Sequence, residues 1–217
     1  MDNYFLFGLQ RTGTNYINQL IRENLYCRYI NSCPHTTVLW KHSITCPTNN
    51  IENIPTIVIY KNPYIWIESL CFRKKMDWCS TQKRFEALEG PEELMVGTSN
   101  NSLNIKILSQ AYKKWYESWI LPKDKNIYII KYEELLMKET REAHLKVISQ
   151  ILKPNKQKSI YEDIPMGEVF LSQDFDQKKL ERYRKNETLY LNPNHKKIIT
   201  ETITKGIISS LGYQPQN

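Results

Sequence analysis

Residues 4–21 read YFLFGLQRTGTNYINQLI, and this stretch decides how the chain begins to fold. Its first four residues are an apolar run typical of a buried strand, and apolar residues recur at helical spacing after the loop. The loop itself is bounded by Gly8 and Gly13. We therefore expect a strand over Tyr4–Leu9 and a helix over Asn15–Asn24. Backbone N–H groups at the start of that helix should face an anion, because the helix dipole favours negative charge there.

The two glycines have the spacing of the phosphate-binding loop G-x-x-x-x-G-K-[ST], but the residues after the second glycine differ. Thr14 stands where such a loop has its lysine, and Asn15 where it has the Ser or Thr that holds Mg²⁺. The cation inside the loop is Arg11. The loop is predicted to hold a phosphate without the metal chemistry of an ATPase. A glycine-containing turn with no ligand is the alternative interpretation of this motif by itself.

Composition favours one soluble globular domain. The chain has 217 residues, of which 41% are hydrophobic and 24% charged, enough to bury a substantial core. The first residues lack the basic region of a signal peptide, and no stretch is long enough for a transmembrane helix, so we expect a cytoplasmic protein without a membrane span. The five cysteines lack C-x-x-C spacing and are interpreted as reduced thiols, with no zinc site.

The net charge of +7 has two explanations, a basic cleft for an anionic small molecule or a nucleic-acid surface. The lysines are spread along the chain without a long basic block, and no RNP-like or helix-turn-helix signature is present. We therefore expect a small-molecule ligand and no nucleic acid. The oligomeric state is unknown from the sequence.

Strand and helix signals alternate along the chain, which favours a three-layer α/β fold with a central, mostly parallel sheet flanked by helices. Beyond the first strand and helix, strands are expected over residues 27–30, 37–41, 56–60 and 127–131, and helices over residues 64–73, 103–120, 140–152, 180–185 and 193–211. Residues 74–101 are weakly periodic and are predicted to be a lid or insertion within a single domain of residues 1–217. Residues 154–176 are predicted to be irregular.

Polar residues at two further strand ends are candidates for a ligand site. Lys61 follows the strand over 56–60, and Ser69 lies on the next helix. Since open parallel sheets bind ligands at the carboxyl ends of their strands, both side chains are expected to contact one anionic group. His42 follows the strand over 37–41, where an imidazole can act as a general base near neutral pH. A surface lysine, a helix serine and a structural histidine are the alternatives.

Together and in this order, the motifs resemble those of the sulfotransferases that use 3′-phosphoadenosine 5′-phosphosulfate (PAPS). Residues 11–16, RTGTNY, resemble the 5′-phosphosulfate loop [KR]-[ST]-G-T-T-[WFL]. Residues 56–69 resemble the strand and R-[ND]-P-x-x-x-x-x-S motif of the 3′-phosphate site. Lys41-His42 resembles the catalytic-histidine segment of cytosolic members, and residues 129–135, IIKYEEL, resemble a segment near the nucleotide.

The resemblance implies a P-loop NTPase-like sulfotransferase domain that needs no metal. Such an enzyme moves a sulfuryl group from PAPS to a hydroxyl or amine of a small-molecule, glycan or lipid acceptor and releases adenosine 3′,5′-bisphosphate (PAP). Arg11 is implied to stabilise the leaving nucleotide, and His42 to take the acceptor's proton. The nucleotide-binding residues it implies are Gly8, Arg11, Thr12, Gly13, Thr14, Asn15, Tyr16, Lys61, Ser69 and Tyr132. The acceptor is expected to lie beneath residues 74–101, which include Trp78 and Phe85.

The chain departs from the family pattern in three places. Lys61 replaces the usual arginine, so a point charge replaces a bidentate contact. Asn15 replaces the second threonine of the loop, although its backbone N–H can still serve. The basic Arg-Lys-Gly loop is absent, and on charge alone Arg182, Arg184 and Lys185 are candidates to replace it at the nucleotide.

Three other functions remain open at this point. A P-loop nucleotide or nucleoside kinase shares the glycine spacing but needs a lysine at position 14. A basic nucleic-acid-binding protein would explain the charge and would lose affinity steeply with salt. A sulfotransferase-like protein without activity would keep the fold alone.

Overall fold

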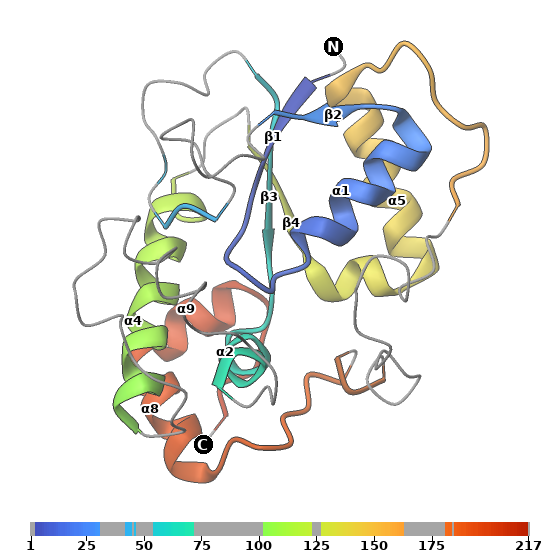
Figure 1. Cartoon of the computed structure of the whole chain (residues 1–217). Coiled ribbons are helices and arrows are strands. Elements are labelled where there is room, and N and C mark those ends of the chain that lie inside the picture. The colour runs from blue at the N-terminus through green and yellow to red at the C-terminus, as the bar shows by residue number, and fades with distance from the viewer. Residues whose placement is uncertain are drawn as a thin grey trace. The chain divides into compact units, whose positions relative to one another are not determined.

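The computed structural model describes residues 3–30, 42–44, 46, 54–71, 102–122, 127–162, 181–183 and 185–216 (Figure 1). The chain divides into two compact units. The first comprises Met1–Lys61 and Pro122–Lys185, and the second Asn62–Leu121 and Asn186–Asn217. The expected insertion at residues 74–101 lies outside the described residues, and a single domain over residues 1–217 stays a prediction.

The first unit is built on a four-stranded parallel sheet in the order β2-β1-β3-β4. Its strands are β1 (Asn3–Phe7), β2 (Arg28–Tyr29), β3 (Thr56–Tyr60) and β4 (Ile127–Lys131). In the centre, Phe5 of β1 pairs with Thr56 of β3, and Thr56 pairs with Ile127 of β4. Residues 4–7 and 56–59 are all buried, the continuous apolar pattern of strands in parallel sheets. The prediction of an α/β fold with a parallel sheet is confirmed.

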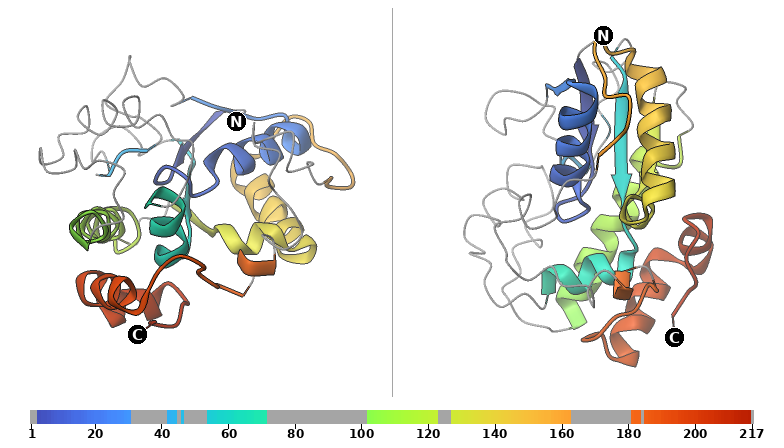
Figure 2. Two further views of the ribbon diagram at one scale, coloured as in Figure 1. Left: turned by 60° about the horizontal axis from the view of Figure 1, so that its bottom comes forward. Right: turned by 90° about the vertical axis from the view of Figure 1, so that its right-hand side faces the viewer.

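Two helices, α1 (Thr14–Leu25) and α5 (Lys138–Leu152), lie side by side on one face of this sheet (Figure 2). Each buries an apolar stripe that includes Ile17 and Leu20 on α1 and Leu145 and Ile148 on α5. A 3₁₀ helix, η2 (Tyr132–Leu136), joins β4 to α5 and is not among the sequence-predicted elements. The three-layer, P-loop-like form of the fold stays a prediction.

Asn24, near the end of α1, holds a distant part of the first unit. Its Nδ2 donates to the carbonyl oxygens of Leu20, at 2.9 Å, and Glu162, at 3.0 Å. Its Oδ1 accepts from the N–H of Glu162 at 2.7 Å, and its own carbonyl accepts from the N–H of Lys158 at 2.9 Å. Residues 154–162 have no helix or strand, as predicted, and residues 163–176 lie outside the described part of the chain.

The part of the second unit that the structure describes is helical. It contains α2 (Pro63–Cys71), α4 (Ser102–Trp119), α8 (Pro193–Ile203) and α9 (Lys205–Ser210), with α4 packed against both α2 and α8. Its core is aromatic, because Trp66 and Tyr112 are both buried and their ring centroids lie 5.4 Å apart. Side chains cap three of its helices at the N-terminus: Asn62 accepts from the N–H of Tyr64, Asn192 from that of His195, and Thr204 from that of Ile207.

The prediction of one closing helix over residues 193–211 is wrong, because Thr204 interrupts it. Thr204 has φ 77° and ψ 144°, outside the helical region, and separates α8 from α9. Its hydroxyl accepts a hydrogen bond from the N–H of Ile207 at 3.4 Å and so begins the next helix. Apolar residues continue at helical spacing across the break, so the periodicity of the sequence does not reveal it.

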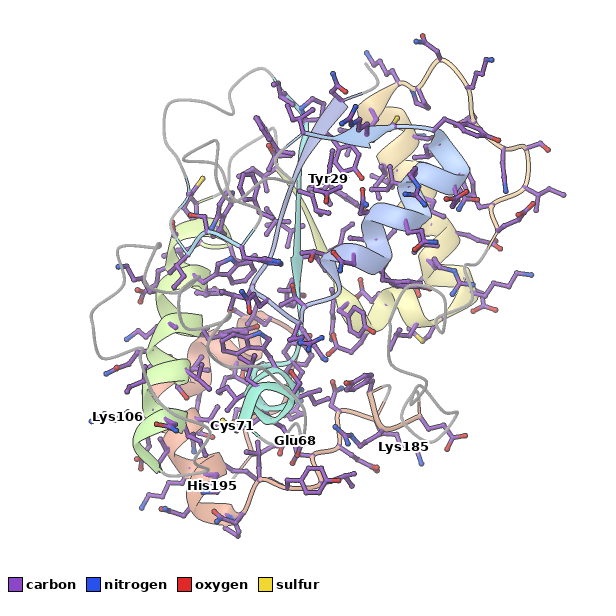
Figure 3. All side chains as sticks on the ribbon, in the orientation of Figure 1. Tyr29, Glu68, Cys71, Lys106, Lys185 and His195 are labelled. Atoms are coloured by element: carbon purple, nitrogen blue, oxygen red, sulfur yellow. The ribbon has the colours of Figure 1, made fainter. Side chains whose placement is uncertain are left out.

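A buried carboxylate anchors residues 189–190 in the second unit. Glu68, on α2, is 2% exposed (Figure 3). Its Oε2 accepts hydrogen bonds from the N–H groups of Leu189, at 2.7 Å, and Tyr190, at 2.8 Å. The side chains of Leu189 and Tyr190 are exposed. The hydrogen bonds from Glu68 therefore hold the backbone of these residues in place, although their side chains do not pack into the core.

Other expectations have mixed outcomes. The strand over 27–30 is the two-residue β2, residues 181–183 are helical within the expected 180–185, and the strand over 37–41 lies outside the described residues. Cys27, Cys46 and Cys71 are thiols outside any disulfide, and burial raises the pKa of Cys71 to about 12. In the described ranges, no helix combines the length and the apolar character needed to cross a membrane.

Candidate functional site

The loop between β1 and α1 is a tight turn stabilised by Thr12. The N–H of Thr12 donates to the carbonyl oxygen of Leu9 at 3.1 Å, and its hydroxyl donates to the same oxygen at 2.6 Å. Arg11 adopts a left-handed conformation, with φ 70°. Both donors of Thr12 are thus directed into the loop, so Thr12 shapes the loop and does not offer these donors to a ligand.

Gly8 allows the loop to approach β3 closely. A Cβ at residue 8 would lie 2.7 Å from Ile59 Cγ2, Ile59 O and Thr12 Oγ1. Two of these atoms belong to the central strand and the third to the hydroxyl that closes the turn. A side chain at residue 8 would therefore push the loop away from the sheet.

Gly13 is the N-cap residue of α1, with φ 96°. Because glycine has no side chain, it cannot cap the first-turn N–H groups in the way that Asn62 and Asn192 cap α2 and α8. A Cβ at residue 13 would overlap the ring of Tyr132, the first residue of η2. At the start of α1, residue 13 thus provides no side-chain cap for the first-turn N–H groups. The ring of Tyr132 packs against the backbone at the same place.

His42 lies against the same loop. Its Nδ1 is 2.7 Å from the carbonyl oxygen of Gly8. A carbonyl oxygen can only accept, so Nδ1 carries the hydrogen of this bond. In the neutral ring, the lone pair is then on Nε2. The structure thus brings the His42 ring to the loop and directs Nδ1–H to the carbonyl oxygen of Gly8.

Lys61, directly after β3, is 3% exposed, and its ammonium lies close to two aromatic rings. Its Nζ is 4.1 Å from the ring centroid of Tyr183 and 5.1 Å from that of Tyr132. The two rings meet edge-on, with centroids 6.0 Å apart and planes at 79°. We call these three residues the Lys61 cage. Since Tyr132 also packs on Gly13, it connects Lys61 to the loop.

The tyrosines around the loop, Tyr132, Tyr16 and Tyr183, are buried. Burial raises the pKa of Tyr132 well above its ordinary value, and the neighbouring Tyr183, Tyr16 and Glu133 raise it further. Tyr16 is 1% exposed, and its hydroxyl makes a long hydrogen bond of 3.5 Å to the carbonyl oxygen of Leu135. The side chain of Tyr16 is packed inside the unit. The adenine contact expected of it stays a prediction.

Several residues predicted for the site take no part in the contacts that join the loop, His42 and Lys61. Ser69 belongs to the second unit, where its hydroxyl donates to the carbonyl oxygen of Trp66 at 2.7 Å. Its convergence with Lys61 therefore stays a prediction.

Lys185 is exposed, and its N–H donates to the carbonyl oxygen of Glu181 (Figure 3). Arg184 lies outside the described residues. Asn15 is exposed and Thr14 buried in the first turn of α1.

Sequence reasoning did not single out Tyr183, although it makes the closest of the ring contacts to Lys61. Its neighbour Arg182 places its guanidinium carbon 5.5 Å from the same ring centroid. Alternation of basic and aromatic residues over 182–185, RYRK, was the available signal. The partner, Lys61, is too far away in sequence for that signal to identify.

No cluster of three or more His, Cys, Asp or Glu side chains suited to a metal ion occurs among the residues with described positions. Comparison of the chain with protein-family models, with curated proteins and with solved structures found no match. A function must therefore be inferred from the residues around the loop.

Proposed function

We propose that this chain is a PAPS-dependent sulfotransferase with a P-loop-like fold, which transfers a sulfuryl group to a hydroxyl or amine acceptor. The contact between His42 Nδ1 and Gly8 O carries the proposal. It brings an imidazole, which can act as a base, against the loop whose sequence resembles a 5′-phosphosulfate loop. The loop by itself would support only a turn without a ligand, and His42 by itself only a structural histidine.

The residues in the first unit fit an anionic nucleotide. The N-terminus of α1 offers backbone N–H groups and the positive end of the helix dipole. Arg11 supplies a positive charge inside the loop, and Lys61 supplies a second one that is linked to Gly13 by the ring of Tyr132. The hydroxyl of Thr14 is a further candidate donor. Thr12 contributes by fixing the loop, because its donors bind Leu9.

These groups suit the charge changes of sulfuryl transfer. PAPS, when bound, supplies a sulfuryl group on a phosphosulfate anhydride, whose bridging oxygen gains negative charge as that bond breaks. In the proposal, the Arg11 guanidinium and the N–H groups at the start of α1 are the donors that would stabilise this charge. Because Thr14 and Asn15 replace the lysine and Mg²⁺ ligand of an ATPase, the proposal needs no metal.

His42 is proposed as the general base. Its Nδ1–H is directed to Gly8 O, which holds the ring and leaves the lone pair on Nε2 for the acceptor's proton. General base catalysis is usually worth about 10²–10⁴ in rate. The acceptor remains a small-molecule, glycan or lipid hydroxyl or amine, because residues 74–101, expected to cover it, lie outside the described residues.

Calorimetric titration of the metal-stripped protein with adenosine 3′,5′-bisphosphate, beside ATP with Mg²⁺, tests the nucleotide site. We expect binding of the bisphosphate without metal, weaker binding of ATP, and loss of bisphosphate binding in Arg11→Ala. Arg22→Ala is the matched control, because Arg22 is an exposed arginine on α1 that pairs with Glu23. Binding of ATP that requires Mg²⁺, without preference for a 3′-phosphate, would instead favour a kinase.

Transfer itself is tested with labelled PAPS and a panel of phenol, sugar and lipid acceptors. Product formation that disappears in His42→Ala, while bisphosphate binding persists, is the expected result. Binding without transfer to any acceptor would favour the sulfotransferase-like protein without activity. Association with RNA or DNA that weakens steeply with salt, in place of nucleotide binding, would favour the nucleic-acid-binding alternative.

A further inference from the structure

The Lys61 cage fixes the position of a buried positive charge. Lys61 is 3% exposed, so its ammonium lacks the hydration that a surface lysine has. Its Nζ is 4.1 Å and 5.1 Å from the ring centroids of Tyr183 and Tyr132, and both distances are within the roughly 6 Å over which a ring attracts a cation. The two rings thus help to compensate for burial and limit where the charge can lie.

The two rings come from separate parts of the first unit. Tyr132 begins η2 and is fixed by its contact with Gly13. Tyr183 comes from the helical residues 181–183, where the N–H of Lys185 donates to the carbonyl oxygen of Glu181. Because the ring planes differ by 79°, they present two nearly perpendicular surfaces to Nζ. The position of the ammonium therefore depends on Tyr183 as well as on the loop-linked Tyr132.

This geometry suits an ammonium better than a guanidinium. An ammonium is compact and contacts both rings, whereas a planar guanidinium stacks on one ring and extends about one atom further from the backbone. In a nearly closed environment, the wider group would have to displace a ring, and such overpacking destabilises a core. We propose that Tyr183 is a positioning residue for the Lys61 ammonium and that the Lys61 cage selects lysine over arginine at this position.

The inference rests on the proposed function, because the anion that Lys61 would meet is the 3′-phosphate of the nucleotide. The family that the chain resembles usually has arginine there, whose fork fixes its own geometry on a phosphate. A lysine has no such fork, and the two rings replace it by holding the point charge in place. Arginine at position 61 should then weaken binding here, although it matches the family pattern.

The cage itself can be tested without nucleotide by NMR of protein labelled with ¹³C-lysine. We expect the ε-methylene protons of Lys61, identified by their absence in Lys61→Arg, to be shifted upfield by the rings. The upfield shift should largely disappear in Tyr183→Leu and persist in Tyr183→Phe. The exposed Lys106 on α4 serves as an unshifted reference. An unchanged Lys61 resonance in folded Tyr183→Leu would overturn the role of Tyr183.

Selectivity for lysine is also testable without nucleotide. Lys61→Arg should unfold at a lower urea concentration than the wild-type protein, and Tyr183→Ala in the Lys61→Arg background should recover part of the loss. Equal or greater stability of Lys61→Arg would overturn the selectivity. Since Lys61→Arg keeps the positive charge, a lower urea midpoint in this variant would show that the guanidinium fits the cage less well than the ammonium.

Titration with nucleotides then connects the cage to the phosphate. In Lys61→Arg and Tyr183→Leu, affinity for adenosine 3′,5′-bisphosphate should fall about tenfold, whereas affinity for adenosine 5′-phosphate should stay close to that of the wild type. Tyr183→Phe should retain bisphosphate binding. Undiminished bisphosphate affinity in Lys61→Arg would reject the selectivity. If the wild-type protein bound no bisphosphate, the proposed function would fail, and the NMR and urea results would still decide the cage.

Discussion

The ring of Tyr132 occupies the space that a side chain at Gly13 would need. Gly13 begins α1, and Tyr132 follows β4, so this contact connects the loop after the first strand with the end of the last strand in the described sheet. The same ring lies 5.1 Å from the Lys61 ammonium. One aromatic side chain thus determines the space available at the start of α1 and on one side of Lys61.

Gly13→Ala should lower the free energy of unfolding by about 2 kcal/mol or more. The new methyl group would overlap the Tyr132 ring, and alanine at φ 96° is strained. Gly206→Ala on α9 is the control, since a Cβ there meets no atom within 4 Å and should stabilise the helix by about 0.5–1 kcal/mol. Urea unfolding of both variants measures the contrast. Equal effects would mean that Tyr132 does not restrict residue 13.

His42→Asn should separate the loop contact from the proton transfer. The asparagine amide can still donate to Gly8 O, as His42 Nδ1 does at 2.7 Å, but it cannot act as a base. We expect bisphosphate binding close to that of the wild type and a rate of sulfuryl transfer about 10²–10⁴-fold lower. Calorimetry and a labelled-PAPS assay measure the two quantities. Transfer at the wild-type rate would remove His42 from the mechanism.

Glu68→Ala should cost about 2–3 kcal/mol, because it leaves the N–H groups of Leu189 and Tyr190 without their acceptor. Glu68→Gln should cost less, since its amide oxygen still accepts. The control is Glu201→Ala, which removes an exposed carboxylate 3.9 Å from Lys197 and should change stability by less than about 0.5 kcal/mol. If the two alanine variants were equally stable, Glu68 would not anchor residues 189–190.

His195 should make the protein less stable in mild acid. Burial lowers the pKa of His195 below its ordinary value of about 6.5. Below that value, the unfolded chain takes up a proton more readily than the folded protein, so the stability present at higher pH is lost as the pH falls. Between pH 7.5 and 5.5, the wild-type protein should lose more unfolding free energy than His195→Leu. Identical losses would exclude His195 as a source of this acid sensitivity.

The elements that form the sheet were predictable because their signals are local. Residues 56–60 and 127–131 are strands with the expected bounds, and the glycine-bounded loop lies between the expected strand and helix. The break at Thr204 was not predictable, since a threonine within an apolar repeat does not by itself indicate a left-handed backbone. The short η2 was missed for a similar reason, because its residues have no distinct periodicity.

For the candidate site, the sequence indicated residue types but not partners. It gave reasons to select His42 and Lys61 at strand ends, and the structure adds that His42 contacts Gly8 and that Lys61 contacts two tyrosines. Tyr183 could not be chosen in advance, because its importance comes from a contact between distant parts of the chain. Ser69 shows the opposite case, since its spacing from Lys61 is clear in the sequence while its convergence with Lys61 stays a prediction.

Asn24 has a consequence for the dynamics of residues 158–162, which have no helix or strand. The amide hydrogens of Lys158 and Glu162 are both bonded to Asn24, at donor–acceptor distances of 2.9 Å and 2.7 Å. Irregular surface segments usually exchange their amide hydrogens with solvent quickly, because little energy is needed to open them. These two amides should instead exchange slowly. Asn24→Ala removes the side-chain acceptor of Glu162 but keeps the backbone carbonyl that accepts from Lys158, so fast exchange of both amides in this variant would reveal residues 158–162 and the end of α1 as one cooperative opening unit.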